Sequence, residues 1–515
     1  MRRLTILSSL IVTLFTYQSF SAEPVLDPPS VPGYLIVHGG NDILPIFVEA
    51  FVKISGGPAA KIIYIAMGVE AVGGDDSKHA LEAFKKFGAD AVKSLIITDK
   101  KAANEESTVA ALKDATGVWL AGGTQVKMEE MLASTAVEKE LHALLKREGA
   151  IAGLSGASGR FLPGSIIDLH VAKTEGNERL LRLLGQHPGS VGFGMDADAT
   201  LFAHGRNMVV AGGNVTVCLS PSPTRPAREE VQVPGSHLDL IALIRAAAER
   251  TKPAFPLAKF SPIELEGGTL VIDGGGIPKD ALLRFIQAAG GPDALILVVP
   301  TALGDEVPLD PHEGKLLRAA GATNLKVFHL ATHADAFDGE KIKILNEAKG
   351  IWFCGGRQWR YVDAYLDTPA EKLMHALLKR GGAIGGSSAG ATIQGDYLVR
   401  GNPLGNVQMM SEGYERGLGF LRGVAIDQHF IKRNRFADMT ELKKAFPQLL
   451  GLGIDEGAAV VVTGHVLEVV GIKNVCVYDK YEPPAKDEPD YVSLKPGEKY
   501  DLKKLSRIAP EAPKP

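Results

Sequence analysis

The chain of 515 residues has few cysteines, few aromatic residues and no strong excess of charge of one sign. Three cysteines cannot all pair within the chain, which excludes a disulfide-dense scaffold. With 56 basic and 60 acidic residues the net charge is −4, which gives no support to a protein that binds nucleic acid by neutralising phosphates. What is present, 45% apolar and 23% charged residues, is typical of a globular protein of two or three domains.

The first residues have the layout of a secretory signal peptide. Within residues 1–22, two arginines precede an apolar run over 4–15, and small residues follow. That run is shorter than the roughly 20 residues that a helix needs to cross a bilayer; an uncleaved anchor or an amphipathic start is the alternative interpretation. We expect an exported protein, secreted or periplasmic, with no membrane partner after signal removal. Export permits disulfides, yet Cys218, Cys354 and Cys476 lie in apolar runs and are expected to be buried thiols.

Two stretches of the chain repeat one another. Residues 142–158 and 375–391 are identical at eleven of seventeen positions, at an offset of 233 residues. Further along, the offset between matching motifs grows from 233 to 259, so the second copy carries 26 extra residues. Such repetition indicates an internal duplication. The predicted organisation is a signal peptide (1–22), a degenerate first copy (31–222), a linker with a helix (223–263), a catalytic copy (264–482) and a C-terminal tail (483–515).

Short apolar runs alternate with amphipathic stretches in both copies. Runs such as 269–273, 350–354 and 458–464 have a continuous apolar stretch, which is typical of strands buried on both faces in a parallel sheet. The amphipathic stretches between such runs, for example 279–290, predict helices and therefore βα units. The predicted fold class is α/β, with two tandem homologous doubly wound, mainly parallel sheets and a site outside the carboxyl ends of the strands. The tail is expected to fray, although residues 500–505 could add an edge strand.

In the second copy an apolar strand runs directly into the residues around Ser388, and a helix follows. Residues 386–390 read G-S-S-A-G, the G-x-S-x-G pattern of a nucleophile elbow, in which small neighbours allow a sharp turn at the serine. At the start of the helix, Ser388 would lie beside backbone N–H groups that stabilise a developing oxyanion. A glycine-rich turn or a phosphate-binding loop is the alternative interpretation.

A serine nucleophile needs a base, and the base needs an acid that orients it. His429 follows one apolar run and Glu456 lies at the end of another, so both are candidates. Glu412 and Asp396 lie between the serine and the histidine and remain open as the acid.

Four motifs occur in a fixed order in the second copy. They are GGxQ at 355–358, GxSAGA at 386–391, IDQHFxxRxR at 426–435 and GIDE at 453–456. Together they resemble the cyanophycinase and aspartyl-dipeptidase family of serine peptidases, and the order Ser, His, Glu differs from that of α/β-hydrolases. The resemblance covers the whole second copy and implies a sheet like that of class I glutamine amidotransferases.

The resemblance also implies a role for each matching residue. Ser388 is implied as the nucleophile, His429 as the general base and Glu456 as the orienting acid. A peptide or poly-aspartate-type substrate is implied, and arginines suit a carboxylate-rich substrate because Arg binds carboxylates bidentately. The other implied site residues are the oxyanion-hole amides of Gly356 and Ala389 and the substrate-binding Gln358, Asp427, Gln428, Arg433 and Arg435.

Two residues depart from the family pattern. Arg357 stands where the family loop usually has an aspartate, and Asp438 stands where cyanophycinases carry a third arginine. A negative charge in place of a positive one should alter what the pocket accepts.

The first copy has lost several of these residues. Ser155 and His170 align with the serine and the histidine, but Ala197 takes the place of the glutamate. Thr174 and Gly176 replace the two arginines. Because a histidine without an orienting acid is a poor base, we predict that this copy is catalytically silent.

Asp196 or Asp198 could still supply an acid in the first copy. We expect the two copies to pack as a pseudo-two-fold pair, so that a monomer with an internal pseudo-dimer stands in for a homodimer.

The sequence also leaves alternatives to a peptidase. The alternatives are a non-catalytic peptide-binding protein on the same fold and an esterase or amidase with another substrate. Residues 271–276 read VIDGGG but lack the third glycine of a dinucleotide-binding loop. His329 and His333 have a weak metal-binding spacing without a third ligand, so we expect no metal ion and no cofactor.

Overall fold

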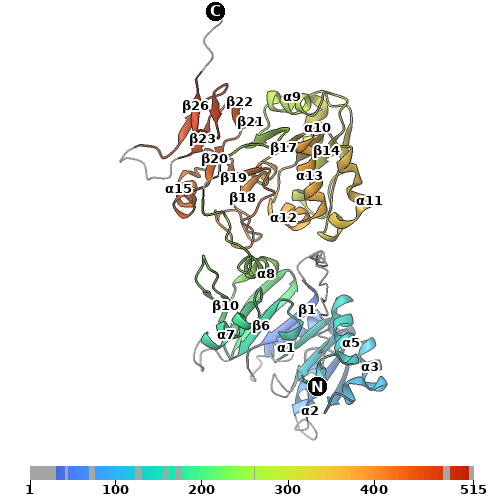
Figure 1. Cartoon of the computed structure of the whole chain (residues 1–515). Helices are drawn as coiled ribbons and strands as arrows, with labels where there is room; N and C mark the ends of the chain where they lie inside the picture. The colour runs from blue at the N-terminus through green and yellow to red at the C-terminus, as the bar shows by residue number, and fades with distance from the viewer. Residues whose placement is uncertain are drawn as a thin grey trace, which may run out of the picture.

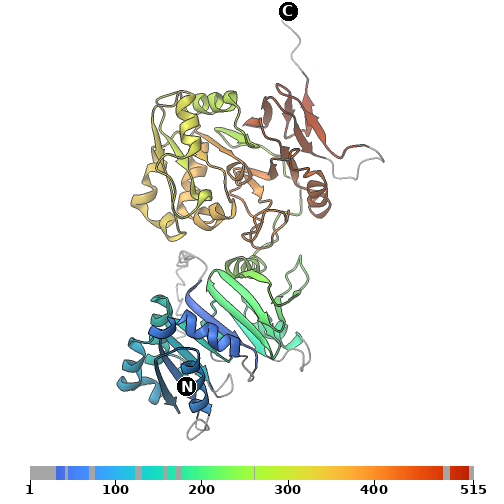
Figure 2. The same cartoon turned by 180° about the vertical axis from the view of Figure 1, so that it is seen from behind.

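The computed structural model describes residues 30–40, 45–68, 76–121, 130–154, 159–169, 177–259, 261–479 and 488–509. Two lobes lie one beyond the other along the molecule (Figures 1 and 2). We call residues 31–252 the first lobe and residues 261–509 the second lobe. The predicted signal peptide lies outside the described residues.

The first lobe contains two sheets. The larger has the strand order β12-β9-β8-β1-β5-β4-β2-β3. Neighbouring strands in the part β1-β5-β4-β2-β3 are parallel, whereas the pairs β12–β9, β9–β8 and β8–β1 are antiparallel. Its strands are β1 (Val31–His38), β2 (Lys61–Met67), β3 (Ala91–Ile97), β4 (Gly117–Ala121), β5 (Ala150–Leu154), β8 (Ala199–Gly205), β9 (Asn207–Gly212) and β12 (His237–Asp239). The smaller sheet contains β6 (Ser165–Leu169), β7 (Val191–Met195), β10 (Val215–Leu219) and β11 (Arg228–Gln232).

In the described residues of the first lobe, six α-helices accompany these sheets. They are α1 (Pro45–Ile54), α2 (Asp76–Lys86), α3 (Glu106–Lys113), α5 (Ala136–Lys146), α7 (Glu178–Gln186) and α8 (Leu240–Glu249). Helix α8 lies at the end of the lobe that faces the second lobe (Figure 1).

The second lobe also contains two sheets. The larger has the order β15-β14-β16-β17-β13-β21-β22-β25-β26, and the smaller has the order β18-β19-β20-β23-β24. The larger is formed by β13 (Thr269–Asp273), β14 (Ile296–Val299), β15 (Leu325–Val327), β16 (Gly350–Phe353), β17 (Ala383–Ser387), β21 (Ala458–Thr463), β22 (Val466–Gly471), β25 (Lys499–Asp501) and β26 (Ser506–Ile508). The smaller is formed by β18 (Gly395–Tyr397), β19 (Leu421–Gln428), β20 (Leu450–Ile454), β23 (Val475–Tyr478) and β24 (Val492–Leu494).

Helices cover both faces of the larger sheet in the second lobe. The α-helices of this lobe are α9 (Lys279–Ala288), α10 (His312–Ala319), α11 (Gly339–Ile342), α12 (Trp359–Tyr365), α13 (Pro369–Lys379), α14 (Ala389–Thr392) and α15 (Phe436–Ala445). Along β16, Ile351 packs in one core cluster with Leu377 of α13, whereas Trp352 packs in another with Phe285 of α9. Because successive side chains point to opposite faces, this strand is apolar at every position.

The prediction of a mainly parallel sheet needs one correction. The order β15-β14-β16-β17-β13 is parallel, but β21, which follows the apolar run at 458–464, pairs antiparallel with β13. An apolar strand buried on both faces reports burial and not direction. Each lobe also has a second sheet that the predicted doubly wound sheet did not include.

The predicted boundaries of the linker and the tail also need correction. Strands β11 and β12 lie in the predicted linker, yet they pair with β10 and β9 of the first lobe, and α8 contributes Leu240 and Leu243 to its core. In the predicted tail, β24, β25 and β26 join the two sheets of the second lobe. These strands are short or partly exposed, so no apolar run marks them.

The contacts between the lobes do not have the symmetry of the predicted pseudo-two-fold pair. Within the described part of the chain, the ion pairs between lobes join residues 206–252 of the first to residues 363–416 of the second. A two-fold pair would repeat each contact with the roles exchanged. Of the second-lobe residues in these pairs, Glu412, Glu415 and Arg416 lie between the motifs at 386–391 and 426–435, where the second copy carries its 26 extra residues; we call this stretch the extra segment.

The three cysteines are buried and unpaired, as predicted. They lie in or directly after strands, where burial raises the pKa of each thiol above its ordinary value. They are therefore core residues.

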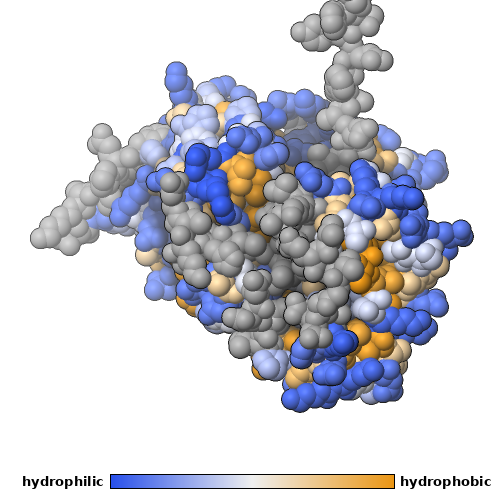
Figure 3. Space-filling model, turned by 90° about the horizontal axis from the view of Figure 1, so that it is seen from below, coloured by the Kyte–Doolittle hydropathy of each residue, from blue (hydrophilic) through white to orange (hydrophobic). Residues whose placement is uncertain are grey.

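The described helices include none that is both long and apolar enough to cross a membrane. Figure 3 views the molecule from below, the end formed by the first lobe, and shows hydrophobic side chains in small separate areas among hydrophilic ones.

Candidate active site

Ser388 lies at a strained turn between β17 and α14. Its φ is 54° and its ψ is −114°, a conformation that L residues rarely adopt. A Cβ at Gly386 would lie 2.4 Å from the carbonyl oxygen of Gly390, and one at Gly390 would lie 2.1 Å from that of Phe353. Both positions therefore require glycine, as expected for a nucleophile elbow.

The three predicted triad residues form one hydrogen-bonded chain. Oγ of Ser388 lies 2.9 Å from Nε2 of His429, and Nδ1 of His429 lies 2.8 Å from Oε1 of Glu456. Each residue directly follows or lies just beyond a strand: β17, β19 and β20. All three side chains are only partly buried, so a substrate can reach them.

The two other candidate acids serve elsewhere. Glu412 forms ion pairs with arginines of the first lobe. Asp396 accepts a hydrogen bond from the backbone N–H of Gly423. Of the three candidate acids, Glu456 is the one that hydrogen-bonds to His429 in this structure.

A glycine loop after β13 holds all three parts of this chain in place. The carbonyl of Asp273 accepts from the N–H of Ser388 at 3.1 Å, and that of Gly274 accepts from the N–H of His429 at 2.9 Å. The carbonyl of Gly275 accepts from the residue after Glu456 at 2.7 Å. A Cβ at Gly275 would lie 2.5 Å from Cε1 of His429. The VIDGGG motif thus has a role that sequence reasoning missed: its glycines allow close approach to the histidine.

The charges around the histidine favour its neutral form. Burial, followed by the positive charge of Arg433, lowers the pKa of His429 below its ordinary value. The hydrogen bond from Lys432 is the main reason that the pKa of Glu456 is lowered, with a second contribution from His429. At neutral pH, His429 can therefore accept a proton while Glu456 is ionised.

A buried carboxyl lies behind the nucleophile. Oδ1 of Asp273 accepts from Oγ of Ser387 at 2.8 Å and from the N–H of Gly275 at 2.9 Å. Burial raises the pKa of Asp273 to about 7. This side chain fixes the residue next to Ser388, and nothing in the sequence apart from its place at a strand end marked it.

The predicted oxyanion-hole amides are available. Among the described residues, none accepts a hydrogen bond from the backbone N–H of Gly356 or Ala389. Helix α14 has only four residues, so the individual N–H groups, and not a helix dipole, would stabilise an oxyanion. The N–H of the neighbouring Gly355 donates to Oε1 of the buried Glu313 at 2.8 Å, which orients this loop. Glu313 was missed because it lies in a distant helix, α10.

Four of the five predicted substrate-binding residues are buried. Gln358, Asp427, Gln428 and Arg435 are at most 5% exposed. The polar groups of Gln358, Asp427 and Arg435 bind other parts of the protein. Among the described residues, Oε1 of the buried Gln428 has no hydrogen-bond partner. The role of these four residues in binding substrate stays a prediction. The fifth, Arg433, is exposed and close enough to lower the pKa of His429.

A network of ion pairs connects Asp427 and Arg435, on either side of His429, to Arg400 of the extra segment. Oδ1 of Asp427 accepts from Arg435 at 2.7 Å and from Nε of Arg400 at 3.0 Å. Nη2 of Arg400 also donates to Oδ2 of Asp438 at 2.5 Å. Asp438 thus neutralises Arg400, a residue that sequence reasoning did not single out.

The other departure from the family pattern has a structural role too. Nη2 of Arg357 donates to the carbonyls of Asn402 and Gly405 at 2.7 and 3.1 Å. The side chain of Gln358 donates to the carbonyls of Val399 and Arg400 at 3.0 and 2.8 Å. The loop that carries Gly356 therefore holds the start of the extra segment.

The two histidines with metal-binding spacing are engaged in hydrogen bonds. His329 pairs with Oγ1 of Thr301 at 3.0 Å and with the carbonyl of Asp305, and Nε2 of His333 lies 3.2 Å from the carbonyl of Leu366. In the described residues, no group of three or more His, Cys, Asp or Glu side chains is arranged to hold a metal ion.

The corresponding region of the first lobe is described only in part. Ser155, His170, Thr174 and Gly176 lie outside the described residues. Ala197 lies two residues after the end of β7, and its methyl side chain supplies no carboxylate at the position of Glu456.

The two aspartates beside that alanine differ in their surroundings. Oδ2 of Asp196 accepts from the N–H of Asn214 at 3.3 Å, and Asp198 is exposed.

Comparison with known proteins assigns the family. Residues 271–470, which include Ser388, His429 and Glu456, match a family model described as Peptidase family S51. The cyanophycinase of Geminocystis herdmanii is 31% identical over 204 residues, which cover 39% of this chain and 75% of that protein. The cyanophycinase of Synechococcus elongatus is 32% identical over 206 residues, covering 39% of this chain and 63% of that protein.

Among solved structures, a peptidase from an acI-B1 Actinobacterium aligns with a TM-score of 0.37 and 22% identity, over 47% of this chain and 98% of that one. The family match and the identity to the first of the cyanophycinases carry the assignment. The chain belongs to peptidase family S51 and is a serine-type peptidase.

Proposed function

We propose that this chain is an exported peptidase of cyanophycinase type that hydrolyses aspartyl linkages, including isopeptide linkages, through Ser388, His429 and Glu456. The observation that carries this proposal is the pair of hydrogen bonds, 2.9 and 2.8 Å, that joins the three side chains in order. A peptide-binding protein without catalysis has no need of an activated serine at a strained turn.

The first half of the reaction forms an acyl-enzyme. Nε2 of His429 accepts the proton of Ser388 Oγ as that oxygen attacks the carbonyl carbon of the substrate. The N–H groups of Gly356 and Ala389 donate to the oxyanion of the tetrahedral intermediate. When the intermediate collapses, the C–N bond breaks and His429 gives its proton to the leaving amine. Glu456 stabilises the imidazolium throughout without taking its proton.

The second half releases the product. A water molecule attacks the ester carbonyl while His429 accepts its proton, and the C–O bond to Ser388 breaks as His429 returns a proton to the serine. The product is a carboxylate, and the serine hydroxyl is restored.

The proposed substrate class follows from the charge beside the histidine. In the described part of the chain, the guanidinium of Arg433 forms no ion pair, and it lies on the exposed side of the histidine loop. A free guanidinium favours a carboxylate-bearing substrate, such as an aspartyl peptide. The relatives named as cyanophycinases support the same class.

We further propose that the chain arose by duplication, with a glutamine amidotransferase-like fold in both lobes and a catalytically silent first lobe. The order β3-β2-β4-β5-β1-β8-β9 in the first lobe parallels β15-β14-β16-β17-β13-β21-β22 in the second and supports this proposal. The alanine at position 197 supports the loss of activity. Export is proposed on the residue pattern of the leader alone.

The decisive test compares wild type with Ser388→Ala on an Asp–Arg polymer and on α- and β-aspartyl dipeptides, together with labelling by a fluorophosphonate probe. Cleavage of an aspartyl substrate and labelling that both depend on Ser388 support the proposal. Labelling without cleavage of any aspartyl substrate, but with hydrolysis of simple esters or amides, favours an esterase or amidase. Absence of labelling favours the peptide-binding alternative.

A further inference from the structure

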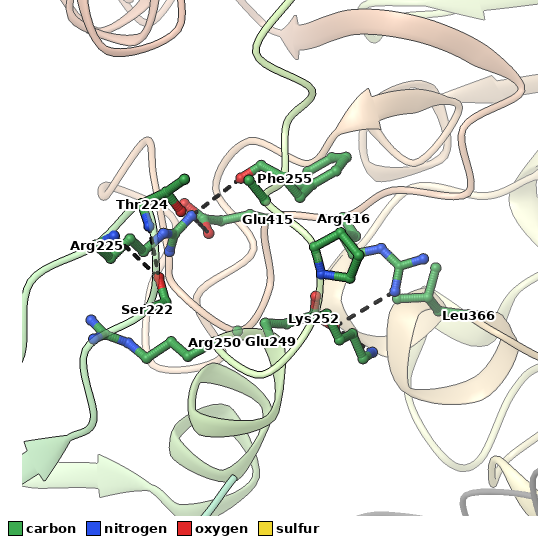
Figure 4. Close-up of a pocket in the computed structure, with 13 residues that line it drawn as sticks. Ser222, Thr224, Arg225, Glu249, Arg250, Lys252, Phe255, Leu366, Glu415 and Arg416 are labelled. Atoms are coloured by element: carbon green, nitrogen blue, oxygen red, sulfur yellow. Dashed lines mark hydrogen bonds and ion pairs between the residues drawn. The ribbon is translucent and has the colours of Figure 1, made fainter. Parts of the chain in front are cut away.

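The two lobes meet through ion pairs in which nearly all the positive charges belong to the first lobe and nearly all the negative charges to the second. Arginines of the first lobe face acidic residues of the second, and Figure 4 shows part of this junction, with Arg225, Arg250 and Glu415 around a small cavity. Arg225 pairs with Glu415 at 2.7 Å, and Nε of Arg250 pairs with Glu412 at 2.7 Å. One pair has the opposite polarity, Arg416 of the second lobe with Glu249 of α8 at 3.6 Å.

Arg206, in the turn between β8 and β9, makes several contacts with the second lobe. Its Nη1 donates to Oδ2 of Asp363 and its Nη2 to the hydroxyl of Tyr414, both at 2.8 Å. The guanidinium also lies over the ring of Trp359, 4.2 Å from its centroid. Trp359 is the first residue of α12, which begins directly after Gln358 of the loop that carries Gly356.

A second contact holds the tip of the extra segment. Glu412 accepts from Arg250 and pairs with Arg225 and Arg228 at 3.3 and 3.4 Å. Burial opposes ionisation, but the hydrogen bond from Arg250 leads the effects that hold the pKa of Glu412 below its ordinary value. The next residue, Gly413, packs on α8 so closely that a Cβ would lie 2.4 Å from the carbonyl oxygen of Ala242. No larger residue fits this contact.

The same segment reaches the active site at its other end. We call residues 398–416 the wall segment. Its two arms are joined by hydrogen bonds from Leu398 N–H to the Glu415 carbonyl at 2.7 Å and from Arg400 N–H to the Met409 carbonyl at 2.9 Å. Arg400 then binds Asp427, two residues before His429.

We propose that the first lobe is a positioning element of the second lobe's active site: through Arg206 and the arginines around Glu412 it holds α12 and the wall segment in the arrangement that accepts substrate. This inference rests on the proposed function for the location of the active site. It gives the first lobe a role that does not require catalysis. Arg206 and Glu412 are positioning residues in this sense, because neither touches the reacting atoms.

The wall segment needs such support because it is long and irregular. Outside helices and strands, a loop of this length keeps one conformation only where it is tied to its surroundings. Its polar ties to the second lobe include those to Arg357, Gln358 and Asp427, which lie in the loop that carries Gly356 and in the strand before His429. The segment is also anchored by the buried side chains of Leu398 and Tyr414, which belong to the core of this lobe. A shift of the segment would therefore be transmitted to the loop that carries Gly356 and to the strand end before His429.

The test uses Glu412→Gln and Arg206→Lys in the full chain. The matched controls are Glu468→Gln and Arg284→Lys, which alter an Arg–carboxylate pair of the second lobe at 3.2 Å that does not join the lobes. Active sites are counted by fluorophosphonate titration, so a variant that merely folds less well shows unchanged constants per site. KM and kcat are measured on an aspartyl dipeptide that wild type cleaves, and amide hydrogen exchange is measured in all variants.

We expect Glu412→Gln to raise KM by about 3- to 10-fold with kcat nearly unchanged. Arg206→Lys should raise KM similarly and lower kcat by about threefold, because it also releases Trp359 and α12. Exchange at 398–416 should be faster in both variants and unchanged in both controls. The inference is overturned if KM and exchange at 398–416 match wild type, or if the controls change equally.

The two proposals fail in different ways. A wild-type protein that neither reacts with the probe nor cleaves any aspartyl substrate contradicts the proposed function. Exchange at 398–416 needs no activity and still decides whether the first lobe holds the wall segment.

Discussion

The loops after β1 and β13 make the same backbone contacts in the two lobes, although Ala197 of the first lobe stands at the position of Glu456 in the second. Gly39 donates its N–H to the carbonyl of Ala199 in the first lobe, as Gly274 does to that of Ala458 in the second, at 2.9 and 3.1 Å. A Cβ at Gly39 would collide with the backbone of Asp196, directly after β7, and one at Gly274 with that of Asp455, directly after β20. The two lobes therefore share these backbone contacts.

The difference lies in the side chains that this scaffold presents. The loop residue that is Asp273 in the second lobe is His38 in the first, where its Nδ1 lies 2.7 Å from Oγ1 of Thr200. Ala197 stands where the second lobe has Glu456, which hydrogen-bonds to His429. Packing constrains the backbone approach in both lobes, whereas nothing in the packing requires a carboxylate at a partly exposed strand end.

The largest expected effect separates the lobes by their serines. Ser388→Ala should reduce kcat by roughly 10⁴-fold or more, because no other group can form the acyl-enzyme. The matched change Ser155→Ala should leave kcat and KM at wild-type values. Steady-state kinetics on an aspartyl dipeptide measure both. Loss of activity in Ser155→Ala, or its retention in Ser388→Ala, would reverse the assignment of the active lobe.

The next effect concerns the orienting acid. Glu456→Gln should lower kcat by roughly 10³-fold, because the amide neither stabilises the imidazolium nor enforces the tautomer that accepts the serine proton. The reciprocal change Ala197→Glu, made in a Ser388→Ala background, should restore no activity, since the first lobe also lacks the arginine that corresponds to Arg433. Measurable turnover in that double variant would show that one carboxylate is all that the first lobe has lost.

A smaller effect appears in the pH profile. His429 must be neutral to act as the base, so kcat/KM should fall about tenfold per pH unit below its pKa, and that limb should lie below about 6.5 because burial and Arg433 lower the pKa. Arg433→Gln removes the nearby positive charge and should move the acid limb to higher pH. An acid limb above pH 6.5 in wild type, or one that Arg433→Gln leaves in place, would contradict this electrostatic account.

The smallest expected effect concerns stability and the buried carboxyl that the first lobe lacks. Because burial raises the pKa of Asp273 to about 7, its contribution to stability is complete at pH values below the unfolded pKa and is lost as pH rises through about 7. The Tm of wild type should therefore fall relative to that of Asp273→Asn as pH rises from about 4 to about 8. Differential scanning calorimetry measures this difference, and Asp114→Asn, at an exposed position, should follow wild type throughout. Parallel curves for wild type and Asp273→Asn would refute it.

Residue patterns predict much of the structure around Ser388, His429 and Glu456. The strands over 269–273 and 350–354 and the helix over 279–290 were predicted because apolar periodicity reports burial, and they match β13, β16 and α9 closely. The elbow around Ser388 was predicted because only small residues fit its turn. By contrast, β21 was given the wrong direction, since burial on both faces looks the same in parallel and antiparallel strands.

The roles of charged residues were harder to predict. Asp427 and Arg435 were expected to face substrate, but they neutralise each other in the interior with Arg400. Asp438 pairs with Arg400, and its effect on what the pocket accepts stays a prediction. A charge in a sequence does not reveal its partner, because partners come from segments far apart in the chain.

The order of residues along the chain was enough to predict the buried strands, the sharp turn at the nucleophile and the three groups that could transfer a proton, because these depend on local pattern and residue chemistry. Only the tertiary structure decided which charges meet substrate, which neutralise one another and what holds the irregular segment beside the active site. These depend on distances between segments far apart in the chain, and a fraction of an ångström or a few degrees of side-chain rotation decides whether a carboxylate meets an arginine or water.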